Sequence, residues 1–184
     1  MRIISFSELE SAPWKNGGGT TREITAARIG DMLVWRLSMA DVASDGPFSN
    51  FEGYTRILTV IEGKGVRLVG KDRVLDAHYG APVEFSGASP IEAKLTDGPI
   101  RDLNLIFDPK RCGGKVELAK APMHLKLEAN LNRTYAIIGF EGKTRLDAMK
   151  VLHFGDTALI EAGPVELELA DNAAALIVTL NLIV

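Results

Sequence analysis

The strongest constraint on the fold is a series of short β-rich runs separated by turn residues. Several runs alternate apolar and polar positions, as a half-buried strand does. Turns rich in Gly, Asp and Pro separate them at intervals of roughly 8–12 residues, a rhythm typical of a β-sandwich or an antiparallel barrel. The runs are residues 33–39, 54–61, 66–69, 73–76, 82–85, 91–95 and 102–107. We therefore expect an all-β fold.

Helix signals are few. Ser5 and Glu8 have the spacing of a capping box, and Pro13 is close enough to end a helix that begins there. The sequence predicts one short helix over about residues 6–10.

The chain also repeats itself. The verbatim tetrapeptide Leu-Asn-Leu-Ile at 103–106 returns at 180–183, and residues 57–64 are echoed by residues 136–143. Two further echoes follow the same order, at an offset between 74 and 79 residues: Val74-Leu75 and Gly80 with Val151-Leu152 and Gly155, and 91–95 with 165–169. Ordered echoes at a nearly fixed offset predict a duplicated β-unit. The second copy lacks the Trp-Lys-Asn-Gly and Trp-Arg-Leu-Ser segments of the first, so we expect any site in the first copy.

Composition excludes several classes of protein. The net charge is −3 and no basic run is present, which argues against nucleic acid as a partner. The longest apolar run, residues 173–180, is far shorter than the roughly 18 residues of a membrane span. The first residues do not resemble a signal peptide, and the single Cys112 fits a reducing cytoplasm. Cys112 lies in a glycine-flanked connector and is expected to be a spare thiol.

Three consecutive glycines in the segment from Trp14 to Thr21 need a separate explanation. Glycine loses the most backbone freedom on ordering, so such a run is used where the backbone needs positive φ or a close approach. A loop with free N–H groups, the ammonium of Lys15 and two threonine hydroxyls could receive a small anion. A tight turn leading into a sheet explains the run equally well. The spacing does not match a P-loop.

Metal and nucleophile chemistry find little support. His78, His124 and His153 are isolated, and none forms a pair at ligand spacing. No Gly-x-Ser-x-Gly elbow is present. We therefore expect neither a metal nor a cofactor.

Charges on otherwise apolar strands carry the main functional signal. Arg36 and Ser38 share one strand face, Arg56 lies on the same face as two aliphatic residues, and Asp102 and Asn104 share a face of a third strand. Each face could look into water. If they face inward, each buried arginine needs a carboxylate, because an unpaired buried cation costs several kcal/mol. Asp102 could neutralise one, with help from Glu23. Lys15 then leaves a cationic surplus for an anionic ligand.

The dense motifs at 13–20 (Pro-Trp-Lys-Asn-Gly-Gly-Gly-Thr), 35–38 (Trp-Arg-Leu-Ser), 45–49 (Asp-Gly-Pro-Phe-Ser) and 56–63 resemble the HutD/Ves family. Residues 85–87 and 97–104 fit the same pattern, so the resemblance covers nearly the whole chain. It implies a bicupin, two jelly-roll β-barrels with few short helices: 1–110 with the ligand site, and 111–184, mainly structural. It also implies a small cytoplasmic bacterial protein without the cupin metal triad. Members are associated with histidine utilisation, where they are thought to bind an intermediate such as urocanate or formylated glutamate. Another branch is described as stress-inducible.

These expectations give one main hypothesis and two alternatives. The main one is non-catalytic binding of a small carboxylate metabolite, which modulates histidine utilisation. The alternatives are a metal-independent isomerase or hydrolase using Glu23 and Asp102, and an interaction module for a regulatory protein. A homodimer is left open. Phe48, Ser49 and Phe51 could form a rim or plug the core. The expected ligand-binding residues are Trp14, Lys15, Asn16, Gly17, Gly18, Thr20, Arg36, Ser38, Phe48, Ser49, Arg56, Asp102 and Asn104.

Overall fold

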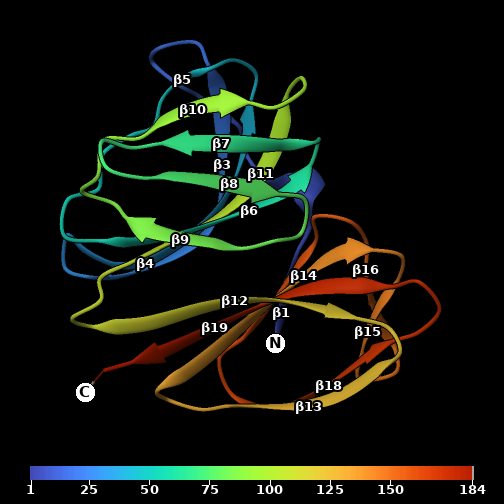
Figure 1. Ribbon diagram of the computed structural model, residues 1–184. Coiled ribbons are helices and arrows are strands. Elements are labelled where there is room, and N and C mark those ends of the chain that lie inside the picture. Colours follow the sequence, from blue (N-terminus) through green and yellow to red (C-terminus); the bar gives the residue numbers. More distant parts are fainter. Residues whose placement is uncertain (184) are drawn as a thin grey trace. The chain divides into compact units, whose positions relative to one another are not determined.

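The computed structural model describes residues 1–183 and consists almost entirely of β-strands (Figure 1). The all-β prediction is confirmed. The chain forms two compact units, which we call the N-terminal unit (Glu10–Arg111) and the C-terminal unit (Met1–Leu9 with the described residues from Cys112 onward). This division differs from the predicted one, which placed residues 1–110 in the first unit. Residues 1–9 belong to the second unit, where the strand at residues 2–4 pairs.

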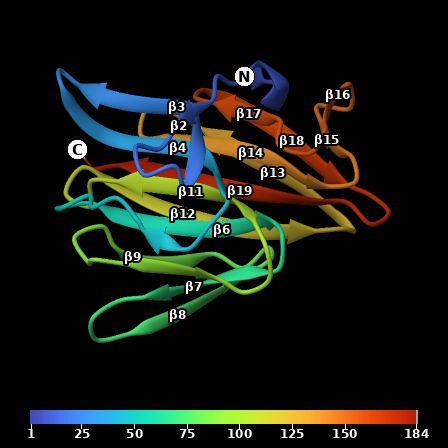
Figure 2. The same cartoon turned by 90° about the horizontal axis from the view of Figure 1, so that it is seen from above.

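The N-terminal unit contains two open antiparallel sheets, with strand orders β2-β3-β4-β11-β6-β9 and β5-β10-β7-β8. In Figure 2, β7 and β8 run side by side at the edge of the smaller sheet. The strands are β2 (Ala12–Pro13), β3 (Gly19–Ile29), β4 (Met32–Val42), β5 (Gly46–Pro47), β6 (Thr55–Glu62), β7 (Gly65–Val69), β8 (Val74–His78), β9 (Val83–Ser86), β10 (Glu92–Leu95) and β11 (Ile100–Phe107). Each predicted run from residue 33 to 107 overlaps one of these strands.

The C-terminal unit also contains two open sheets, ordered β1-β17-β14-β19-β12 and β13-β18-β15-β16. Its elements are β1 (Arg2–Ile4), the 3-10 helix η1 (Phe6–Glu8), β12 (Cys112–Lys120), β13 (Met123–Ala129), β14 (Arg133–Glu141), β15 (Thr144–Leu146), β16 (Lys150–Leu152), β17 (Thr157–Ile160), β18 (Gly163–Leu169) and β19 (Ala174–Leu182). The expected closed barrels are not formed by the strand ladders, since each sheet of the described residues ends on two edge strands.

The predicted α-helix is replaced by the single turn η1. The capping box does not form, because the Ser5 side chain caps no backbone N–H and its hydroxyl lies 3.0 Å from that of Ser7. Leu9 is already extended, and the chain enters β2 soon afterwards. No helix among residues 1–183 has the length and apolar character that spanning a membrane requires.

The two units share one strand order. The run β4-β11-β6-β9 corresponds to β12-β19-β14-β17, and β5-β10-β7-β8 corresponds to β13-β18-β15-β16. A bulge recurs at the same point of the central ladder: Asp102 pairs with Val60 beside one bulge, and Ala175 pairs with Gly139 beside the other. This register aligns Leu103 with Leu176, so the verbatim tetrapeptide at 180–183 lies four residues beyond its structural counterpart.

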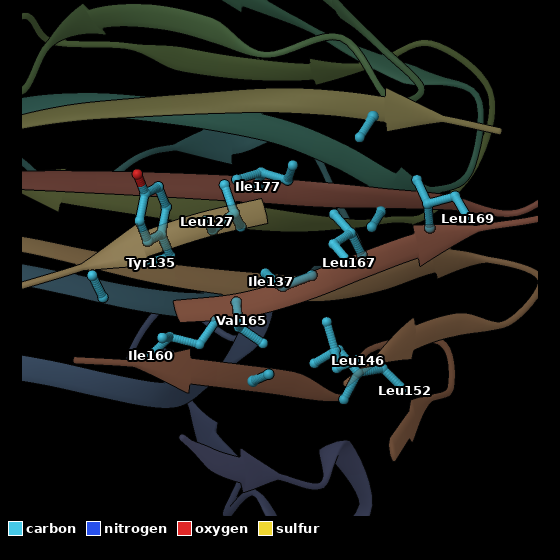
Figure 3. Close-up of a cluster of buried hydrophobic side chains, with 14 of the residues drawn as sticks. Leu127, Tyr135, Ile137, Leu146, Leu152, Ile160, Val165, Leu167, Leu169 and Ile177 are labelled. Carbon is cyan, nitrogen blue, oxygen red and sulfur yellow. The ribbon is translucent and has the colours of Figure 1, made fainter. Parts of the chain in front are cut away.

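Each unit has a hydrophobic core drawn from both of its sheets. In the C-terminal unit, Tyr135 and Ile137 of β14 belong to one cluster with Leu146 of β15 and Leu167 of β18 (Figure 3). In the N-terminal unit, Leu58 and Val60 of β6 cluster with residues of β7, β8 and β10. The N-terminal cluster ends where polar residues replace aliphatic ones on the inner face of the larger sheet, and this is where the candidate site lies.

Candidate functional site

A cavity of about 620 Å³ opens in the N-terminal unit. Its floor is the inner face of the sheet formed by β4, β11 and β6, and its walls come from the loop at Trp14 and the loop at Phe48. The five predicted strand residues line it: Arg36, Ser38, Arg56, Asp102 and Asn104.

Strand register arranges the floor in rows across three strands. Ile106 of β11 pairs with Arg36 on one side and Arg56 on the other. The next row is Ser38, Asn104 and Leu58, and the third is Ala40, Asp102 and Val60. Because side chains alternate across a strand, residues two apart share the inner face. Two arginines thus flank one end of the floor, and a lone carboxyl group occupies the other.

Arg56 is 6% exposed and has no carboxylate partner within the described residues. Its Nη1 donates to the Ser49 carbonyl at 3.1 Å and its Nη2 to Asn104 Oδ1 at 2.9 Å, while Nε has no partner in residues 1–183. Its guanidinium lies 5.1–5.4 Å from the ring centroids of Phe48, Phe51 and Phe85. Such cation–π contacts offset part of the cost of burial. Burial lowers the pKa of Arg56 to about 10, partly opposed by Asp102, so the group stays charged at neutral pH.

Asp102 is 1% exposed and is linked to Arg56 through Asn104. The Asn104 Nδ2 donates to Asp102 Oδ1, while Asp102 Oδ2 has no partner in the described chain. Burial raises the pKa of Asp102 to about 7 despite the opposing effects of Arg56 and Asn104, and the charge of Asp41 raises it further. A buried carboxyl group with one neutral donor is poised between its two protonation states near neutrality.

Arg36 is half-buried, and its guanidinium lies 5.2 Å from the ring centroid of Phe51. Burial lowers its pKa, opposed by the charge of Glu23. Its Nε has no hydrogen-bond partner among residues 1–183. Glu23 itself is exposed and does not line the cavity, so the expectation that it accompanies Asp102 inside is wrong.

The glycine loop contributes side chains more than backbone donors. Trp14, Lys15 and Asn16 line the cavity, whereas Gly17, Gly18 and Thr20 do not. The N–H of Gly17 donates to the Trp14 carbonyl at 3.0 Å, and that of Gly18 to Asn16 Oδ1 at 3.1 Å. The Thr20 hydroxyl donates to Asp41 Oδ2 at 3.3 Å. A cradle made of the N–H groups of Gly17 and Gly18 is therefore wrong, because the turn itself uses them.

Close packing explains the glycine run. Gly17 has a φ of 72°. A Cβ on Gly19 would meet the Asp41 carbonyl at 2.3 Å and the Trp14 ring at 3.1 Å. The Trp14 indole is held by its N–H, which donates to Thr21 Oγ1 at 2.7 Å, and it meets Phe48 edge to face at 6.2 Å. A tight turn thus accounts for the glycines. The same turn holds the Trp14 ring in position at the cavity wall.

The Phe48 loop forms the opposite wall. Phe48 and Ser49 line the cavity as expected, joined by Phe51, which we placed at a rim or in a core plug. Backbone N–H groups of Phe48 and Phe51 donate to Ile91 and Gly87 carbonyls at 2.9 and 2.8 Å. These contacts fix the rings that surround the two arginines.

Six lining residues were outside the predicted set: Pro13, Thr21, Ala40, Pro47, Phe51 and Ile106. Strand alternation could have found Ala40 and Ile106, which share faces with Ser38 and Asn104. Thr21 carries one of the two hydroxyls that we considered for an anion, and Pro13 and Pro47 lie inside the family motifs, but no sequence signal distinguished the three as cavity residues. Within residues 1–183, no group of three His, Cys, Asp or Glu is arranged to hold a metal ion.

Two curated bacterial proteins are similar to this chain in sequence. A Pseudomonas putida protein, described as an uncharacterized 21.2 kDa protein in the hutC 3′ region, is 39% identical over 125 residues. That match covers 64% of this chain and 63% of the relative. Protein Ves of Citrobacter koseri is 38% identical over 124 residues, 65% of this chain and 64% of that protein. The match thus spans less than two thirds of both relatives.

Solved structures match over nearly the whole chain. HutD from Pseudomonas fluorescens SBW25 has a TM-score of 0.87 at 27% identity, covering 100% of this chain and 99% of that one. A conserved Pseudomonas aeruginosa PAO1 protein has a TM-score of 0.86 at 30% identity, covering 98% of each chain. A cupin 2 conserved barrel domain protein from Leptotrichia buccalis, with a TM-score of 0.63 and 11% identity over 99% of this chain and 96% of that one, shows a cupin-like fold alone.

The sequence model of the HutD family matches residues 6–177. One of the relatives above is described by its position in the hutC 3′ region. The motifs that resembled HutD/Ves include those that build the cavity, from Trp14 through Arg36 and Phe48 to Arg56. The chain belongs to the HutD family.

Proposed function

We propose that this protein binds a small carboxylate metabolite, related to urocanate or formylglutamate, and does not transform it. Binding modulates histidine utilisation, in keeping with the relative in the hutC region. The cavity volume of about 620 Å³ falls in the usual range for small-molecule sites.

One observation carries the proposal: two guanidinium groups in the cavity have no carboxylate ion pair within the described residues. Asp102 is the one acidic residue among the described lining residues, and its raised pKa leaves it only partly ionised near neutrality. Lys15 adds a third cation at the exposed side. A desolvated cationic surplus is neutralised by an anionic guest at low cost.

The unpaired guanidinium atoms suggest where such a guest binds. The Nε atoms of Arg36 and Arg56 both lack partners in residues 1–183, so each retains a donor. Arginine donors suit the two oxygens of a carboxylate. The rings of Trp14 and Phe48 offer an apolar wall for the uncharged part of the ligand.

Titration calorimetry with urocanate and formylglutamate tests this function. We expect binding to the wild type, and a loss of roughly 10- to 100-fold in affinity in Arg36→Gln, since hydrogen bonds to charged groups contribute about 1.5–3 kcal/mol. Arg67→Gln is the matched control, because Arg67 is exposed and pairs with Asp76 at 2.8 Å. Absence of heat from both acids with the wild type would overturn the proposal.

The alternative is a metal-independent isomerase or hydrolase on a related acid. The pKa of Asp102, raised to about 7, favours it, because a general acid–base group works best near the operating pH. The exposed position of Glu23 leaves Asp102 without a second acid–base residue in the described cavity lining. Turnover of either acid that disappears in Asp102→Asn would establish this alternative in place of simple binding.

The finer architecture and the partners remain part of the proposal. We propose a bicupin in which each unit is a jelly roll; the shared strand order and the two-sheet cores support this. We also propose a cytoplasmic location, for which the single cysteine is the support. A regulatory protein or a second copy of the chain would transmit the bound state, which a pull-down with and without urocanate would detect.

A further inference from the structure

An unused hydrogen-bond acceptor lies at the Asp102 end of the cavity floor. Asp102 Oδ2 is a buried carboxyl oxygen with no partner in residues 1–183. Leaving such an atom unsatisfied costs free energy, so native structures provide it with water or a ligand. Other unpaired buried oxygens, on Thr59, Thr144 and Thr157, belong to residues that do not line the cavity.

No side chain of the described sheet donates to Asp102 Oδ2. The cross-strand neighbours of Asp102 are Ala40 and Val60, whose side chains are aliphatic. Asn104, two residues along β11 on the same face, donates to Oδ1. The two terminal nitrogens of Arg56 donate to Ser49 and Asn104. No donor of residues 1–183 is bonded to Oδ2, and Asp102 lines the cavity, so a ligand in the cavity is a candidate to supply one.

The floor thus presents opposite demands at its two ends. At the Ile106 row, Arg36 and Arg56 retain unused donors; two rows along β11, Asp102 retains an unused acceptor. Four residues of strand separate the two rows by about 13 Å between Cα atoms. The arginine side chains span part of this distance, as the bond from Arg56 to Asn104 demonstrates. A ligand that satisfies both ends therefore needs an acceptor for the arginines at one end and a donor for Asp102 at the other.

We infer that the ligand carries, besides its carboxylate, a nitrogen-bound hydrogen that it donates to Asp102 Oδ2. This inference rests on the proposed function and names the class of ligand: a small carboxylate with an N–H group, such as an azole or amide nitrogen, at its other end. A ligand oxygen in that place faces the carboxylate without a hydrogen bond.

Protonation of Asp102 supplies an independent check. The ionised form accepts an N–H, whereas the protonated form donates an O–H and favours a ligand oxygen. Arg56 and Arg36 are the cations on this floor, Lys15 lies at the exposed side, and the charge of Asp41 acts on Asp102 from β4. Burial raises the pKa of Asp102 to about 7, so a modest pH change alters its form.

The test compares two acrylates of equal size, one bearing a pyrrole ring and one bearing a furan ring, each joined beside the heteroatom. Neither ring titrates near neutrality, and they differ in an N–H against an oxygen. At about pH 8 the wild type should bind the pyrrole compound roughly 10- to 100-fold more tightly, the range for a hydrogen bond to a charged group. The preference should shrink towards about pH 6, because Asp102 gains its proton.

Asp102→Asn sharpens the test. The amide oxygen can keep the bond from Asn104, which leaves an NH₂ group where Oδ2 was, so the pyrrole preference should vanish or reverse. Asp76→Asn, the same change at an exposed residue outside the cavity, should keep the preference. Circular dichroism checks that both variants fold, and the wild-type pH series does not depend on them.

The outcomes distinguish failure of the N–H inference from failure of the proposed function. Equal affinity for both compounds, or a pyrrole preference that grows as pH falls, overturns the inference and leaves carboxylate binding intact. Binding of neither compound, together with silence from urocanate and formylglutamate, overturns the proposed function and this inference with it.

Discussion

At the residue scale, Arg56 is a buried cation held without an ion pair in the described chain. Three ring faces, one carbonyl and one amide oxygen surround it. These groups are weaker than a carboxylate and leave the positive charge largely uncompensated. Evolution commonly accepts such destabilising arrangements at binding sites, where stability is exchanged for function.

Asp102 should make the protein less stable as pH rises. Its pKa rises from 3.8 to about 7 on folding, so the folded state holds a proton that the unfolded state has released between these values. Stability is therefore lost between about pH 4 and pH 7. Asp102→Asn removes this loss and should stabilise the protein by up to roughly 4 kcal/mol at pH 8, with little gain at pH 4. Urea unfolding at both pH values measures it.

The exposed Asp76 is the control for this stability change. Its pKa is lowered by the hydrogen bond from Arg67, so its ionised form favours folding. Asp76→Asn should therefore bring no stabilisation at pH 8. A pH-independent gain in Asp102→Asn would contradict the assignment of a raised pKa to Asp102.

At the element scale, the glycine loop acts as a mount for Trp14. The backbone of Gly19 passes so close to the indole that no side chain fits, and the backbone N–H of Trp14 donates to the Gly19 carbonyl at 2.9 Å. The loop and the first residues of β3 therefore fix the position of the Trp14 ring at the cavity wall.

Gly19→Ala should lower the free energy of unfolding by about 1–3 kcal/mol, the usual cost of forcing a methyl group into filled space. Its Cβ would overlap the Asp41 carbonyl, so β3 or Trp14 has to shift. Gly46→Ala is the matched control, since a Cβ there meets no atom within 4 Å. Denaturant unfolding compares them, and equal losses would contradict the close-packing explanation.

Strands could be predicted here far better than loops. Alternation along residues 33–39 and 102–107 put Arg36, Ser38, Asp102 and Asn104 on common faces, because the two-residue period is a local property. The use of the N–H groups of Gly17 and Gly18 depended on a turn whose partners only the folded loop reveals. The capping box predicted at Ser5 also depended on contacts that the sequence does not show, because the Ser5 hydroxyl lies within hydrogen-bond distance of the Ser7 hydroxyl.

At the scale of the whole molecule, one strand order serves two different interiors. In the register set by the bulges, Asp102, Asn104 and Arg56 correspond to Ala175, Ile177 and Tyr135. Those three belong to the apolar core of the C-terminal unit. The repeated letters at 180–183 could not reveal this, because their register differs by four residues from the structural one. The first copy has charged residues where the second has apolar ones. That a ligand binds in the first copy alone stays a prediction.

Removal of residues 1–9 should weaken the C-terminal unit. The deletion removes the edge strand β1, which leaves its neighbour β17 at the edge of the sheet, and it removes the bond from the Phe6 N–H to Asp156 Oδ1 at 3.0 Å. Amide hydrogen exchange should accelerate in β17, with no change in β4, β6 and β11. Phe6→Ala, which keeps the β1 ladder, should have a smaller effect. Unchanged protection of β17 would contradict the assignment of these residues to the C-terminal unit.

The position of Trp14 has a practical consequence. Both tryptophans of the chain, Trp14 and Trp35, fall within the N-terminal unit. Tryptophan fluorescence consequently reports on the N-terminal unit and not on the C-terminal unit. Because one of these fluorophores stands at the cavity wall against Phe48, a guest that settles there should quench or shift its light without any label being attached.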